Sequence, residues 1–253
     1  MKALRAPLTA MALRMTERTR TVAIDRCYHY RAFRYGGHGN NLYEDYIRGL
    51  AAGQERDELR RHFAESILHC RPKTLGQALQ IELGSWPLWE FPWMRKPASS
   101  VHYQSDPAAV ADVVCQYSEQ GVLTSHINRE FKWLEAAYES IKAIGYQPQR
   151  FGYIRCVELR GEETSSFLVT DGNHRISALH AVGLRTVEVK TSTLERVCRK
   201  DVRRWRRVRE GDMPEALALR VFDRYFAPEN PPLPRLNPTT LVLDEPPAWP
   251  AGR

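Results

Sequence analysis

The sequence predicts an α+β fold, and three observations carry that prediction. Residues 125–192 show helical and extended patterns in the order helix, strand, strand, helix, strand. Residues 21–105 mix aromatic and polar side chains and contain a helical pattern around Glu55–His69. Prolines crowd the chain after Ala227, so regular structure should end there.

Two regions precede the periodic segment. Residues 1–20 form a basic lead in which Arg5, Pro7 and Arg14 interrupt any apolar run of secretory length. We therefore expect a disordered start to the chain and not a secretory signal. Residues 21–105 should be mostly helical and rich in aromatic side chains. Within them, "SWPLWEFPWMRKP" is expected to pack into a core, although aromatic clusters also bind sugars or proline-rich peptides. The glycines of "YGGHGNN" could be the hinges of a mobile lid.

Residues 106–192 hold the clearest periodicity. "NREFKWLEAAYESIKAIG" predicts a helix with Asn128 as its N-cap and Gly145 as its end. "FGYIRCVEL" and "SSFLV" predict strands, "HRISALHAVG" predicts a helix, and "TVEVK" predicts a final strand rich in β-branched residues.

Two regions follow. Residues 193–226 predict a basic helical extension, where Val202, Trp205 and Val208 would anchor an amphipathic helix. The basic run Arg196–Arg209 could instead follow a nucleic-acid backbone, with Trp205 stacked on a base. Residues 227–253 form a proline-rich tail, expected to be extended or disordered.

The composition is that of a globular protein in a reducing compartment. The formal net charge of +7 permits a polyanionic partner without requiring one. The five cysteines are widely spaced and include no C-x-x-C pair, which argues against a disulfide framework or a zinc site. No apolar run approaches the roughly 20 residues that span a bilayer. We therefore expect a cytoplasmic protein without a membrane span.

The segment "TDGNHR" is the strongest candidate site. A helix that begins after Gly172 directs unpaired backbone N–H groups at the turn, and these bind anions. Arg175 carries a planar fork suited to phosphate, and His174 can donate a hydrogen bond or move a proton. Asp171 could hold a metal ion or a substrate. We therefore expect phosphate to bind at Gly172, Asn173, His174, Arg175 and Ser177.

A plainer interpretation also fits these residues. Asp-Gly is a common turn, Asn173 could cap the helix, and His174 and Arg175 could simply face water. The spacing alone does not separate the two interpretations.

The span from about Ser125 to Thr191 resembles the ParB/sulfiredoxin-like family. The resemblance rests on "YESIKAIGYQPQ" and "FLVTDGNHRISALHAVGLRTVEV", which match the order and spacing of that domain and its D-G-x-H-R box. Members of this family include DNA-partition proteins that bind CTP and DNA, sulfiredoxins that use ATP, and small-molecule kinases. "DGNHR" is more similar to the box of the stand-alone, kinase-like members. No cysteine lies between Thr170 and Ala178, which disfavours sulfiredoxin chemistry.

The resemblance implies a nucleotide-dependent phosphotransferase acting on a small hydroxyl-bearing substrate. ATP or another nucleotide would be the cofactor, with Mg²⁺. Asp171 and His174 would take part in catalysis, and Glu130 would correspond to the kinase base. Alternatively, Glu130 is an acidic residue that favours a helix N-terminus.

Two other function classes stay open. The chain could be a ParB-like regulatory or DNA-binding module that uses CTP or DNA without catalysis. It could also be a scaffold that binds no nucleotide. No helix-turn-helix is evident after Val189, the element that usually follows this domain in partition proteins. The oligomeric state is not indicated by the sequence.

Overall fold

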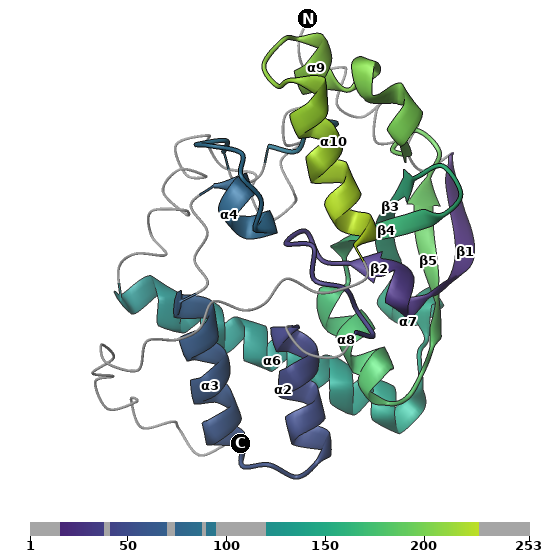
Figure 1. The fold of residues 1–253 in the computed structure, drawn as a ribbon. Coiled ribbons are helices and arrows are strands. Elements are labelled where there is room, and N and C mark those ends of the chain that lie inside the picture. Colours follow the sequence, from purple (N-terminus) through teal and green to yellow (C-terminus); the bar gives the residue numbers. More distant parts are fainter. Residues whose placement is uncertain (1–15, 38–40, 70–73, 88–89, 95–119, 228–253) are drawn as a thin grey trace, which may run out of the picture.

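The computed structural model describes residues 16–37, 41–69, 74–87, 90–94 and 120–227. Their centre is a mixed sheet with strand order β1-β5-β3-β4-β2, and β6 pairs with β3 (Figure 1). The strands are β1 (Glu17–Ala23), β2 (Cys27–Tyr28), β3 (Ile154–Arg160), β4 (Ser165–Asp171), β5 (Thr186–Ser192) and β6 (Val197–Cys198). The α+β class is therefore confirmed.

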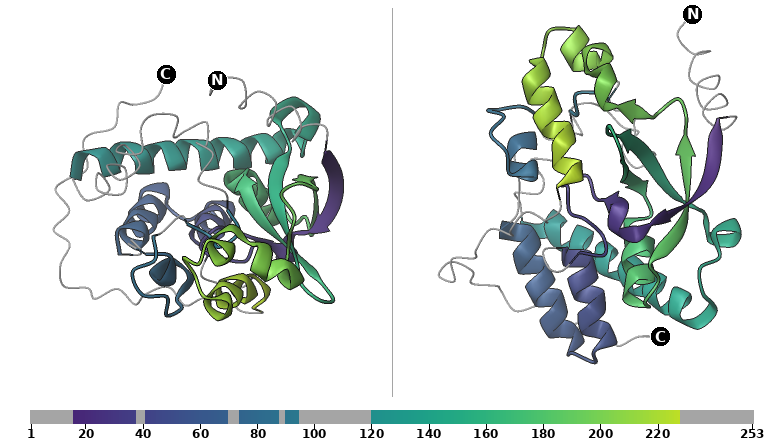
Figure 2. Two further views of the ribbon diagram at one scale, coloured as in Figure 1. Left: turned by 90° about the horizontal axis from the view of Figure 1, so that it is seen from above. Right: turned by 45° about the vertical axis from the view of Figure 1, so that its right-hand side comes forward.

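Helices cover both faces of this sheet (Figure 2). The α-helices are α2 (Leu42–Ala51), α3 (Arg56–His69), α4 (Leu75–Leu79), α6 (Gln120–Ile144), α7 (Pro148–Phe151), α8 (Asn173–Ala181), α9 (Arg206–Arg209) and α10 (Glu215–Asp223). Three 3-10 helices complete the described residues: η1 (Ile24–Arg26), η2 (Arg199–Arg204) and η3 (Arg224–Phe226).

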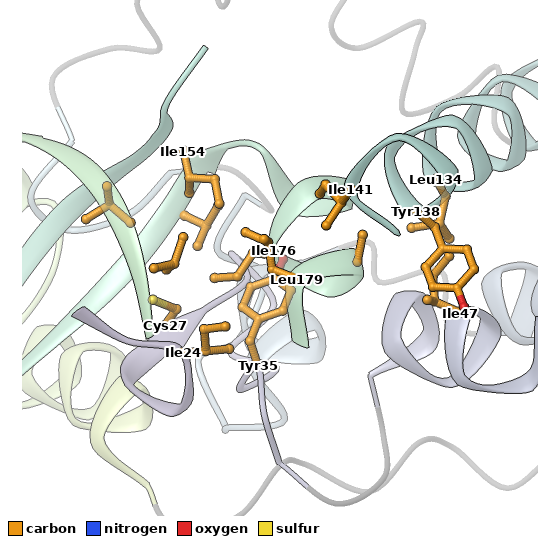
Figure 3. Packing of buried hydrophobic residues seen from close by; sticks show 14 of the residues in the cluster. Ile24, Cys27, Tyr35, Ile47, Leu134, Tyr138, Ile141, Ile154, Ile176 and Leu179 are labelled. Carbon is orange, nitrogen blue, oxygen red and sulfur yellow. The ribbon is translucent and has the colours of Figure 1, made fainter. Parts of the chain in front are cut away.

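The alternation of side chains along the strands builds two hydrophobic cores. On one face, Ile154 and Val169 pack with residues of α2, α6 and α8, among them Ile47, Leu134 and Ile176 (Figure 3). On the other face, Leu159 and Leu168 pack with residues of α4 and α10. Because successive strand residues point to opposite faces, short strands can serve both cores.

The strands and helices predicted within residues 125–192 are present. β3, β4, α8 and β5 lie at the predicted segments, and Gly145, with φ +74°, follows the last residue of α6. The predicted N-cap was wrong. α6 begins at Gln120, so Asn128 lies inside the helix.

The basic lead was predicted to extend to residue 20, but β1 begins at Glu17. β1 pairs antiparallel with β5 along its whole length. The Arg20 guanidinium lies 2.9 Å from the carboxylate of Glu158, whose side chain is largely buried. Arg20 therefore forms an ion pair within the folded sheet and is not part of a disordered lead. Residues 1–15 of the predicted lead lie outside the described residues.

The region 21–105 was expected to be mostly helical and to pack on a domain spanning residues 106–192. Its described part contains α2, α3 and α4, but β1 and β2 also join the central sheet. The sheet therefore takes strands from both sides of the predicted boundary. Parallel pairing of β2 with β4 requires a long-range contact that local sequence patterns do not reveal.

The basic segment after β5 was predicted to form one amphipathic helix, and this prediction was wrong. It forms β6, η2 and α9, and Trp205 interrupts it with an extended backbone, φ −62° and ψ 141°. The Trp205 side chain is buried and contacts the rings of Trp93 and Phe222. Tertiary packing of this indole overrides the local helical pattern, and the prediction that Trp205 is structural is confirmed.

The tryptophan-rich segment packs as expected where it is described. Trp86 and Trp93 lie against the second core, whereas Trp89 lies outside the described residues. Of the predicted lid, Tyr35, Gly36, Gly37 and Asn41 are among the described residues. There the Gly36 amide donates to the carboxylate of Glu44 at 2.8 Å. The proline-rich tail beyond Ala227 is outside the described residues.

Replacing Trp205 by alanine should lower the free energy of unfolding by about 3–5 kcal/mol, since the cavity would lie between two aromatic partners. Trp133, which is 44 % exposed, provides the control, and Trp133→Ala should cost about 1 kcal/mol. Urea unfolding followed by circular dichroism measures both. Equal losses would contradict a structural role for Trp205.

Candidate functional site

The turn after β4 has a backbone that only glycine adopts readily. Gly172 has φ +95° and precedes α8, and no side chain caps the helix. A Cβ at this position would lie 2.9 Å from Ile154 Cγ1 and 3.1 Å from Arg175 Nη2. β4 therefore turns directly into α8, whose first N–H groups have no partner within the helix and form its positive end.

Glu130 and His174 meet beside this helix start. The Glu130 Oε2 atom lies 2.7 Å from His174 Nε2, and the two side chains are 10 % and 21 % exposed. Glu130 comes from α6 and His174 from the first turn of α8, and these helices pack together. Because α6 begins at Gln120, Glu130 does not lie at a helix N-terminus, which removes the plainer explanation for it.

Aromatic side chains enclose His174. The Tyr43 ring lies 5.5 Å from the imidazole and the Trp133 ring 5.9 Å from it, measured between ring centres. The Tyr43 hydroxyl donates to Glu130 Oε2 at 3.3 Å. Burial, and then the charge of Glu130, raises the pKa of Tyr43 well above its usual value. The phenol therefore stays protonated and remains a donor to the carboxylate.

Arg175 is occupied by the protein itself. Its guanidinium donates to the backbone oxygen of Phe151 at 3.0 Å, to that of Gly152, and to Asp171 Oδ2 at 3.2 Å. These bonds tie α7 and the start of β3 to α8. A fork that already binds three acceptors is less suited to phosphate than the sequence suggested.

Asp171 lies apart from the Glu130–His174 pair. Its side chain is 62 % exposed and contacts Arg175, and no hydrogen bond or ion pair joins it to Glu130 or His174. Of the three residues predicted to be catalytic, the structure therefore brings together only Glu130 and His174.

Asn173 and Ser177 form internal hydrogen bonds. The Oδ1 atom of Asn173 accepts from the Tyr35 hydroxyl at 2.7 Å. Ser177 is fully buried, and its hydroxyl donates to the backbone oxygen of Asn173 at 2.9 Å. Both side chains fix the first turns of α8. The Ser177 side chain therefore lies in the protein interior and its hydroxyl is bonded to its own helix; its role as a phosphate ligand stays a prediction.

Sequence reasoning missed His29 and Arg31, which follow β2. His29 is 2 % exposed, and its ring centre lies 5.7 Å from that of Tyr43. Burial, followed by the charges of Arg31 and His174, lowers the pKa of His29 well below its usual value. The signal was the density of aromatic and basic residues in "YHYRAFRY", a pattern that has no fixed spacing.

Most arginines of the basic segment are bound by acidic side chains. Arg196 pairs with Glu158, Arg199 with Asp223, and Arg207 with Glu90 and Asp212. Arg203 and Arg206 pair with Glu215 and Glu210. These pairs offset much of the local positive charge, so the described residues do not favour the nucleic-acid alternative.

Within the described ranges, no group of three or more His, Cys, Asp or Glu side chains is arranged to hold a metal ion. Across the same ranges, none of the helices has the length and apolar character needed to span a membrane.

No family model, curated protein or solved structure matches this chain.

Gly172→Ala should be more destabilising than Gly183→Ala. Gly183 also has a positive φ, +93°, but a Cβ there meets nothing within 4 Å. The control should therefore cost only about 1–2 kcal/mol for the left-handed backbone. The added contact with Ile154 should make Gly172→Ala at least about 1 kcal/mol worse. Urea denaturation compares them, and equal costs would contradict the close approach.

The buried, neutral His29 predicts a loss of stability in acid. An unfolded histidine, with its usual pKa of 6.5, binds a proton that the folded chain excludes. Stability attributable to His29 is therefore present above that pKa and is lost as the pH falls below it, by up to about 1.4 kcal/mol per pH unit.

His29→Gln should lose less stability than the wild type between about pH 7.5 and about pH 5.5, the range in which the unfolded histidine becomes protonated. Urea unfolding in phosphate-free buffers measures this difference. An identical pH dependence in both proteins would contradict a neutral His29.

Proposed function

We propose that this chain is a ParB/sulfiredoxin-like protein and a nucleotide-dependent phosphotransferase that acts on a small hydroxyl-bearing substrate. The proposal rests on the Glu130–His174 pair at the start of α8. A partly buried carboxylate and imidazole at 2.7 Å provide proton transfer. The adjacent helix start provides N–H groups that bind phosphate.

The donors around the turn fit a nucleotide's phosphate groups. No side chain caps the start of α8, so its first backbone N–H groups remain available to an anion. Buried nitrogen atoms without a hydrogen-bond partner lie nearby, at His29 and Arg31. ATP or another nucleotide would supply the phosphoryl group, together with a Mg²⁺ ion bound to its phosphates. Backbone N–H groups near Gly172, Asn173 and His174 would hold the phosphate oxygens.

In this proposal His174 accepts the proton and Glu130 orients the imidazole. If the Nε2–H of His174 donates to Glu130, the ring carries its lone pair on Nδ1. That atom then accepts the proton of the substrate hydroxyl, and the carboxylate stabilises the imidazolium that forms. Tyr43 holds the carboxylate in place. The resemblance implied Glu130 as the base; in this arrangement Glu130 orients His174 instead.

Arg175 and Asp171, from the DGNHR segment, would not transfer the proton in this proposal. Arg175 positions α8 through its bonds to the backbone of Phe151 and Gly152. Asp171, exposed at the edge of the turn, is accessible to a Mg²⁺ ion that arrives with the nucleotide.

A thermal-shift screen with ATP, ADP, CTP and GTP, each with Mg²⁺, identifies the nucleotide, since a ligand that binds the native state raises its stability. The rate at which the enzyme consumes that nucleotide is then measured. His174→Gln and Glu130→Gln should each lower this turnover about 10²- to 10⁴-fold, because proton transfer is lost or misdirected.

Glu139→Gln is the matched control, since Glu139 is an exposed carboxylate on the same helix α6. It should keep wild-type turnover. Both site variants should still bind the nucleotide, which shows that they fold. Full activity in His174→Gln would contradict the proposal, as would a chain that binds none of the four nucleotides.

A further inference from the structure

A tight turn after β2 places two basic side chains beside the Glu130–His174 pair. The His29 backbone oxygen accepts from the Ala32 amide, and the His29 amide donates to Phe33, both at 2.8 Å. Ala32 closes the turn with φ +57°, a conformation that alanine seldom adopts. His29 and Arg31 are therefore held in defined positions.

The hydrogen bonds of His29 fix its tautomer. Its Nδ1 atom accepts from the backbone N–H of Arg31 at 3.3 Å. Because burial keeps the ring neutral, the single proton resides on Nε2. That Nε2–H is buried and has no hydrogen-bond partner. It is a donor without an acceptor, which natural proteins rarely leave inside the fold.

Arg31 presents a second such donor. Its Nε atom is buried and has no hydrogen-bond partner, and no ion pair joins its guanidinium to an acidic side chain of the described residues. Other arginines of this region do find partners, as Arg34 does with Asp25. An arginine that is partly buried without a counter-ion normally has an external one.

Tyr43 connects these donors to the proposed catalytic pair. Its ring contacts those of His29 and His174, and its hydroxyl binds Glu130. The charge of Arg31 lowers the pKa of both His29 and Tyr43. The charge of His174 also lowers the pKa of His29. These four side chains therefore lie close enough to influence one another electrostatically. The Glu130 carboxylate is already bound by His174 and Tyr43.

We propose that His29 and Arg31 form an oxyanion-binding subsite next to the Glu130–His174 pair. Its ligand is a group with at least two acceptor oxygens, such as a phosphate, which the Nε2–H of His29 and the guanidinium of Arg31 would bind together. The group belongs either to the nucleotide or to the acceptor substrate. Anion binding itself does not depend on turnover, but its use during transfer rests on the proposed function.

Inorganic phosphate is the probe, measured by isothermal titration calorimetry on the full chain in a phosphate-free buffer. Arg31→Met should weaken phosphate binding at least tenfold, because it removes the charge and the buried donor. Arg26→Met is the matched control, since Arg26 is an exposed arginine a few residues earlier. It should bind phosphate as the wild type does.

Stability without phosphate distinguishes a binding role from a structural one. Arg31→Met should unfold at the same or a higher urea concentration than the wild type, because the substitution removes an unpaired buried donor. Destabilisation together with unchanged phosphate affinity would overturn the proposal. Wild-type protein that binds no phosphate would overturn it as well.

Competition identifies the source of the anion. If the nucleotide found in the screen displaces phosphate, the subsite holds a nucleotide phosphate; if both bind together, it holds the anionic group of the substrate. Phosphate binding that depends on Arg31, in a chain without any turnover, would support the subsite and refute the phosphotransferase. Glu130→Gln should lose turnover and keep its affinity for phosphate, which separates the two proposals further.

Discussion

The left-handed backbone at Gly172 is the constraint on which the arrangement of the site depends. It lets β4 end and α8 begin without an intervening loop, while the absent Cβ leaves room for Ile154 and the guanidinium of Arg175. α8 is then held from both sides. Ile176 and Leu179 are buried in the core between the sheet and the helices, and Arg175 binds the backbone of Phe151 and Gly152. His174 leaves the first turn of α8 in a defined direction, toward α6.

The distribution of charge sets this site apart from the rest of the described surface. Arg196, Arg199 and Arg207 each meet a carboxylate, and Glu158 binds arginines from two different segments. At the site, Glu130 shares one oxygen between an imidazole and a phenol, while His29 and Arg31 keep buried donors without acceptors. Unpaired buried donors oppose folding, and in the proposed subsite a bound anion would complete those of His29 and Arg31.

Predictions from the sequence succeeded where local patterns and local chemistry agree. The segment from α6 to β5 has strong periodicity, a glycine at the end of a helix and an Asp-Gly turn, and its elements lie where these signals indicate. The predictions failed where distant packing decides. β1 forms because β5 offers a partner and Glu158 offers a counter-charge to Arg20. The helix expected around Trp205 is broken because the indole packs against Trp93 and Phe222.

The family resemblance supplied the candidacy of Glu130. The sequence by itself determined the α+β class, the turn between β4 and α8, and the candidacy of His174. These depend on residue type and on spacing along one stretch of chain, which local sterics and hydrogen bonding translate directly into structure. Only the tertiary structure decided which side chains meet. It paired Glu130 with His174, turned Asp171 toward Arg175, and bonded the Ser177 hydroxyl to the backbone of its own helix. It also brought His29, Arg31 and Tyr43 to the site from distant parts of the chain; Tyr43 and Glu130 are 87 positions apart in the sequence. Such contacts depend on how helices and strands far apart in the chain pack against one another, and no short sequence pattern contains that information.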